Sequence, residues 1–190
     1  MSDRLAQDAR MTHRGAPAAY STTARVLHWA TAVLVLTLLP LGVVIANKWG
    51  GPLQDFLYNL HRSIGAVIIP LVILRLGYRI THAPTPLPAD VPPFQQAAAH
   101  ATHWALYALL MVQPFLGWVA TSAFPAPIPV FGLFELPPIW SADRPLSDRL
   151  FVVHGLIAAA IACLATLHIG AALYHHFVRK DGVLMRMITG

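Results

Sequence analysis

Histidine is the residue type in this sequence whose number and spacing best suit metal chemistry. Two of the ten histidines, His154 and His168, lie fourteen residues apart in the apolar stretch 153–179. Fourteen residues of α-helix rise about 21 Å and return to within about 40° of the starting direction, so both imidazoles leave one helix face at two depths. This spacing predicts a helix that carries two stacked metal centres.

The composition indicates a membrane protein. The 190-residue chain is 56% hydrophobic and 11% charged, which is too apolar for a soluble globule of this length. The net charge of +5 fits the basic cytoplasmic loops of membrane proteins and does not imply nucleic-acid binding. The one cysteine, Cys163, excludes a disulfide framework, a thiolate metal cluster and covalent haem attachment through a C-x-x-C-H motif.

Four apolar segments are long enough to cross a bilayer, and proline-rich or glycine-rich connections separate them. We therefore expect an all-α, integral membrane four-helix bundle that forms a single domain over residues 21–190, preceded by a disordered cytoplasmic tail over residues 1–20. Ser21, Thr22 or Thr23 could cap the first helix. Residues 125–146, which mix prolines with aromatic side chains, predict an ordered loop on the membrane surface. The predicted spans are about 25–47, 56–79, 96–124 and 147–178.

The distribution of lysine and arginine predicts the orientation of the bundle. Four spans put both termini on one side, together with the connection between the second and third spans. Of the 13 Lys and Arg residues, all but Lys48, Arg62, Arg144 and Arg149 fall on that side. The positive-inside rule therefore predicts that both termini of this multi-pass membrane protein are cytoplasmic.

Counting along each helix from its periplasmic end predicts which histidines lie at the same depth. His61 is six residues from Asp55 and His154 is five from Arg149, so both lie roughly 8 Å deep. His28 is twenty residues from Lys48 and His168 is nineteen from Arg149, so both lie roughly 29 Å deep. Two histidines on different helices at one depth are what a bis-imidazole haem iron needs, and the pattern occurs twice.

Alternatives to this pairing concern one further histidine and other metals. His103 lies at roughly 31 Å by the same count, so counting alone cannot choose between His28 and His103 as the partner of His168. Zinc or copper would need convergent ligands with carboxylates or thiolates nearby, and the spans contain almost none. Small residues such as Gly65, four after His61, also suit the close approach of a flat macrocycle, although they are common at any transmembrane helix contact.

Other polar residues near the cytoplasmic level suggest haem propionate or quinone contacts. His175 follows His168 by seven residues on the same helix face, and His103, Arg75 and Trp29 lie at a similar depth. For His13, His82, His100 and His176 we favour a solvated or interfacial position.

These residues together resemble the bacterial cytochrome b561 family of four-helix dihaem membrane proteins, which is related to the b-type cytochrome subunits of formate dehydrogenases and nickel-iron hydrogenases. The resemblance covers about residues 20–188. It rests on R-x-x-H-W at 25–29, His61 with Gly65, R-L-x-x-R at 75–79 and A-x-H-A-T-H-W around His103. Its most specific part is the H-x13-H pattern of His154 and His168, which runs into YHHFVRKDGVLMRM at 174–187.

The resemblance implies two b haems, one held by His28 and His168 near the cytoplasm and one by His61 and His154 near the periplasm. It also implies transfer of single electrons from a periplasmic donor to ubiquinone, with superoxide as the donor in a superoxide oxidase-like activity. The alternative is an anchoring subunit that passes electrons between a periplasmic dehydrogenase or hydrogenase and quinone. The loop over residues 125–145 would then bind that redox partner.

Overall fold

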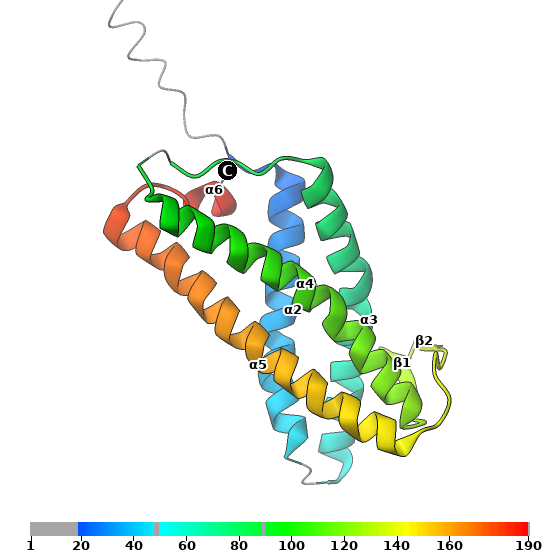
Figure 1. Cartoon of the computed structure of the whole chain (residues 1–190). Coiled ribbons are helices and arrows are strands. Elements are labelled where there is room, and N and C mark those ends of the chain that lie inside the picture. The colour runs from blue at the N-terminus through cyan, green and yellow to red at the C-terminus, as the bar shows by residue number, and fades with distance from the viewer. Residues whose placement is uncertain (1–18, 48–49, 89, 190) are drawn as a thin grey trace, which may run out of the picture.

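Figure 1 shows the computed structural model of the chain, which describes residues 19–47, 50–88 and 90–189. Four long helices run up and down in it and confirm the predicted membrane four-helix bundle, since each is long and apolar enough to cross a membrane. The expected disordered tail falls almost entirely outside the described residues, as does Lys48. The four helices are α2 (Thr22–Ala46), α3 (Pro52–Thr81), α4 (Pro93–Ala123) and α5 (Arg144–Tyr174).

The helix ends follow from local sequence signals. The Ser21 side chain accepts a hydrogen bond from the backbone N–H of Ala24 and caps α2. Asp143 does the same for α5 through the N–H of Leu146. Helix α5 therefore begins at Arg144, three residues before the predicted start at Ser147. Gly51 has a φ of 85° immediately before α3, a conformation that glycine adopts without strain and that allows the tight turn from α2.

The connection between α4 and α5 contains a β-hairpin that the sequence did not predict. Strands β1 (Ile128–Val130) and β2 (Phe134–Leu136) pair antiparallel. Phe131 and Gly132 turn the chain with positive φ angles of 50° and 72°. The buried Ser63 of α3 holds the hairpin, because its hydroxyl donates to Pro129 O at 2.7 Å and accepts from Phe131 N at 3.0 Å.

The bundle has a small apolar core at its mid-height. Helix α2 packs mainly on α3, and α4 packs mainly on α5. The central cluster is Val35, Ile68, Val72 and Ile161. Three of these residues lie seven positions after a predicted ligand histidine: Val35 after His28, Ile68 after His61 and Ile161 after His154. Ile161 also lies seven positions before His168. Because seven residues are about two helical turns, the core lies between the two histidine levels.

The two ends of the described chain meet at one end of the bundle. Beyond α5, the chain forms a π-helix η1 (His175–Arg179), where a longer regular helix was expected, and then a short helix α6 (Met185–Ile188). The indole N–H of Trp29 donates to Met187 O at 2.9 Å, and Arg25 donates to Ile188 O at 2.7 Å. The C-terminal segment is therefore fastened across the start of α2 (Figure 1).

Candidate metal centres

Two pairs of histidines face each other across the bundle at two levels. The ring centres of His61 on α3 and His154 on α5 are 6.3 Å apart. Those of His28 on α2 and His168 on α5 are 6.2 Å apart. The structure thus brings together the histidines that the depth count paired, and α5 supplies one member to each pair.

The spacing within each pair fits a metal bound between the rings. Two imidazoles that bind one iron from opposite sides, with metal–nitrogen bonds of about 2 Å, have ring centres about 6 Å apart. Direct hydrogen bonding between the rings would bring them closer. In addition, the buried Nδ1 atoms of His61 and His154 have no hydrogen-bond partner, which is costly for structural histidines inside a bundle.

His103 of α4 lies beside His168 in a different geometry. The two ring centres are 5.1 Å apart, about 1 Å closer than the rings of either facing pair, while the angle between the ring planes is similar in all three contacts. That separation is too short for a metal bound between the two imidazoles in line. His103 therefore suits a side contact with His168 better than the opposite axial position.

A half-buried arginine adjoins the pair at the terminal end of the bundle. Arg75 Nη2 lies 2.9 Å from His28 Nδ1, and its guanidinium stands 5.2 Å from the Tyr107 ring centre. An arginine only donates hydrogen bonds, so Nδ1 of His28 accepts here. A neutral imidazole that binds a metal through Nε2 carries its proton on Nδ1, so this contact has to open when a metal binds.

Two glycines, Gly42 and Gly117, pack against the rings of the His61–His154 pair. The sequence analysis did not predict either contact. A Cβ atom at Gly42 of α2 would lie 3.4 Å from His61 Cε1, and one at Gly117 of α4 would lie 3.0 Å from His154 Cε1. Both rings therefore rest against bare backbone. By contrast, a Cβ at Gly65, one turn after His61, would meet nothing within 4 Å, which leaves the room that a macrocycle needs there.

His175 is held by a polar group at the end of η1. Its Nδ1 is bonded to the Asp181 carboxylate, which Arg179 also contacts at 3.1 Å. Burial raises the pKa of Asp181, but hydrogen bonds from His175, the Val183 N–H and Arg179 outweigh it and hold that pKa below its usual range. The remaining described histidines outside the bundle interior, His82 and His100, are exposed as expected, whereas His176 is half-buried beside Phe177.

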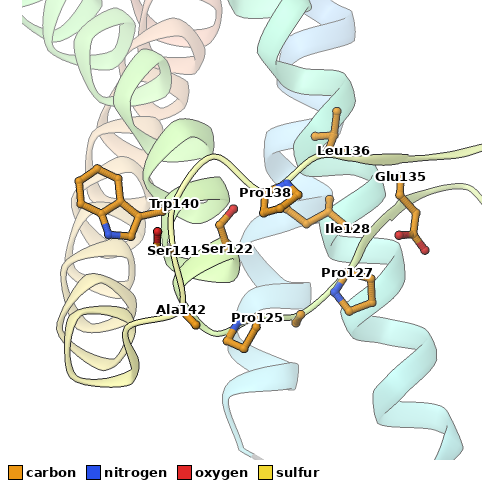
Figure 2. A pocket seen from close by; sticks show the side chains of 11 residues that line it. Ser122, Pro125, Pro127, Ile128, Glu135, Leu136, Pro138, Trp140, Ser141 and Ala142 are labelled. Carbon is orange, nitrogen blue, oxygen red and sulfur yellow. The ribbon is translucent and has the colours of Figure 1, made fainter.

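The loop between α4 and α5 presents apolar side chains at the far end of the bundle. Phe131, Phe134 and Trp140 are each more than half exposed. A neighbouring hollow has a volume of about 430 Å³. Figure 2 shows Trp140 and Glu135 on opposite sides of it. It lies between the loop and the end of α4, away from the histidine pairs.

The composition of the interior excludes other common metal sites within the described residues. No group of three or more histidine, cysteine, aspartate or glutamate side chains converges there, and Cys163 is exposed. Zinc and copper sites need such convergent sets. Facing imidazole pairs in an apolar bundle instead fit non-covalent b haem.

Comparisons with known proteins agree with this geometry. Residues 19–190 match the family described as prokaryotic cytochrome b561. Cytochrome b561 homolog 2 of Escherichia coli K12 is 31% identical over 94% of this chain and 95% of its own length. The probable superoxide oxidase CybB of Yersinia pestis is 28% identical over 85% and 91%. Cytochrome b562 of Cereibacter sphaeroides is 29% identical over 85% and 90%.

The match covers the whole described bundle, including all four facing histidines and the C-terminal segment. A relative more than 30% identical across nearly its full length leaves no room for a different fold. The chain therefore belongs to the prokaryotic cytochrome b561 family, as a multi-pass bacterial membrane cytochrome that binds b-type haem and transfers electrons.

Proposed function

We propose that the protein holds two b haems, with His61 and His154 as axial ligands of one and His28 and His168 as axial ligands of the other. The observation that carries this proposal is the pair of matching ring separations, 6.3 Å and 6.2 Å. When bound, each haem supplies one-electron redox chemistry at its iron. The chain itself supplies the ligands, fixes their orientation and keeps water away from the path between the two levels.

We propose further that the terminal end of the bundle is cytoplasmic in the bacterial inner membrane. Among the described residues, this end carries more lysine and arginine than the other. It has Arg25, Arg75, Arg79, Arg179, Lys180 and Arg186, and the other end has Arg62, Arg144 and Arg149. This excess supports cytoplasmic termini by the positive-inside rule. The His61–His154 pair is then periplasmic and the His28–His168 pair cytoplasmic.

The electron donor in this proposal is superoxide and the acceptor is ubiquinone. Two superoxide anions each lose one electron and become oxygen, while ubiquinone gains these two electrons and two protons and becomes ubiquinol. Among the described residues at the periplasmic end, Arg144 forms a salt bridge with Asp148. Arg62 and Arg149 form none with any described residue, and they are the cations proposed to attract an anion locally. The name of the Yersinia pestis relative, a probable superoxide oxidase, agrees with this choice.

The cytoplasmic acceptor site is proposed among Arg75, His103 and His175, with Trp29 at its margin. Arg75 can leave His28 for a propionate or a quinone oxygen. Trp29 is less available, because its indole N–H is bonded to Met187 O. A quinone contact through Trp29 would require the C-terminal segment to move.

Haem quantification tests the ligand assignment directly. We expect two haems per chain in the parent and one in each of His61→Ala and His28→Ala, measured by pyridine haemochrome and reduced-minus-oxidised spectra. Retention of both haems in His28→Ala would transfer the ligand role to His103. For the activity, purified protein given an enzymatic flux of superoxide should reduce ubiquinone, and haem that stays oxidised under this flux would refute the donor assignment.

A second candidate function is that of a membrane anchor for a periplasmic redox subunit. The exposed Phe131, Phe134 and Trp140 of the loop between α4 and α5 favour it, since an exposed cluster of apolar side chains suits a protein interface. Co-purification of a large metal-containing subunit after mild solubilisation would support this function. Full superoxide-dependent quinone reduction by the isolated chain would show that no partner subunit is required, and it would contradict this function.

A further inference from the structure

One polar side chain in the middle of α4 lies beside the periplasmic-side histidines, and the proposed function gives it no role. Gln113 donates a hydrogen bond from Nε2 to the backbone carbonyl of His154 at 3.0 Å. Its carbonyl oxygen Oε1 is buried and has no partner. A buried amide oxygen without a partner in an apolar bundle is costly, so Oε1 of Gln113 is a free acceptor for a nearby hydrogen-bond donor.

The same neighbourhood holds the complementary donor. Nδ1 of His154 is also buried without a hydrogen-bond partner of good geometry, although the backbone of Gln113 lies near enough to this ring to interact with it. If His154 binds iron through Nε2, as the proposed function requires, its Nδ1 carries the proton and needs an acceptor. Gly117, one helical turn after Gln113, touches the same ring, because a Cβ there would lie 3.0 Å from Cε1 and 3.4 Å from Nδ1. The α4 face that contains Gln113 and Gly117 is therefore the face against which His154 packs.

We propose that Gln113 is a positioning residue for the periplasmic-side haem, and that its amide oxygen accepts the Nδ1 proton of His154 when the haem is bound. The bond would fix the ring orientation and make the imidazole a stronger ligand, which favours the ferric state. His61 differs in this respect. Its Nδ1 also lacks a partner, but the α2 residue beside its ring is Gly42, which offers no side-chain acceptor. The two axial ligands are thus supported unequally.

The test compares Gln113→Leu with Gln113→Glu by redox titration of each haem. Leucine removes the acceptor, so the midpoint potential of the His154 haem should rise by about 60 mV, which is a tenfold change in a one-electron equilibrium. Glutamate keeps an oxygen acceptor, so its potential should stay at or below that of the parent. The other haem should be unchanged in both variants. Val112→Leu, at an exposed position of the same helix, is the matched control.

Several outcomes distinguish this proposal from the ligand assignment on which it rests. Equal shifts in the leucine and glutamate variants would overturn it, because both lose the amide donor to the His154 carbonyl and only one loses the acceptor. Loss of haem from both variants, or no shift in either, would also overturn it. Loss from the leucine variant alone would support it. Retention of both haems in His154→Ala would instead remove His154 as a ligand.

Discussion

Replacing Gly117 with alanine should weaken the hold of the protein on one haem. The new Cβ would lie 3.0 Å from Cε1 of His154, where ordinary van der Waals contact begins at 3.4 Å. The imidazole would have to move by the difference, about 0.4 Å, or α4 would have to yield. Since axial ligation depends on the orientation of this ring, the strain falls on the metal–ligand bond.

The size of the effect follows from two opposing terms. Overpacking in a well-packed interior costs about 1–3 kcal/mol, while alanine improves helix propensity over glycine by up to about 1 kcal/mol. The net cost to the bundle is about 1 kcal/mol, and if all of it falls on ligation by His154, this haem binds roughly fivefold more weakly. Gly42→Ala is the matched control, because its Cβ would lie 3.4 Å from His61 and needs little or no movement.

The assay is haem loss during a thermal ramp in detergent, followed through the Soret band, with haem per chain measured beforehand. Gly117→Ala should release one haem at a lower temperature than the parent, and Gly42→Ala should resemble the parent. If the two variants released haem at the same temperature, the close contact between Gly117 and His154 would carry no energetic weight and the reasoning would be wrong.

Three further predictions address other parts of the molecule. His103→Ala should retain two haems by pyridine haemochrome, since its 5.1 Å separation from His168 is too short for shared ligation; loss of one haem would contradict this. Ser63→Ala removes the hydroxyl bonds to the hairpin at Pro129 and Phe131, at a local cost of about 1–3 kcal/mol. This variant should be cleaved faster by protease at the exposed Leu133. Thr37→Ala should not, because the Thr37 hydroxyl bonds only to its own helix. Asp181→Asn should lower the thermal midpoint of unfolding at neutral pH. Because the folded-state pKa of Asp181 is depressed, its contribution to stability is present above the ordinary carboxyl pKa of about 4 and is lost as the pH falls through the folded-state value. The thermal midpoints of parent and variant should therefore become equal in acid.

Much of the bundle could be predicted because a membrane span is recognisable from its own run of apolar residues. Four apolar segments, the Ser21 cap and the Gly51 turn all depend on neighbouring residues alone. The hairpin could not be predicted, because strands of three residues carry little periodicity and this one depends on Ser63, which is 66 residues before Pro129. The π-helix at His175 was also missed, because a change from α-helical to π-helical hydrogen bonding leaves little trace in the hydrophobic pattern.

The sequence by itself determined that four histidines stand at two matched depths, because rise per residue along a membrane-spanning helix is nearly fixed. It did not determine which neighbours approach each ring. Helix rotation and tilt decide that His103 stands 5.1 Å from His168 while His28 stands at 6.2 Å, and that Gly117 and Gln113 meet His154 from α4. These contacts come from packing between helices far apart in the chain, and no local pattern encodes them.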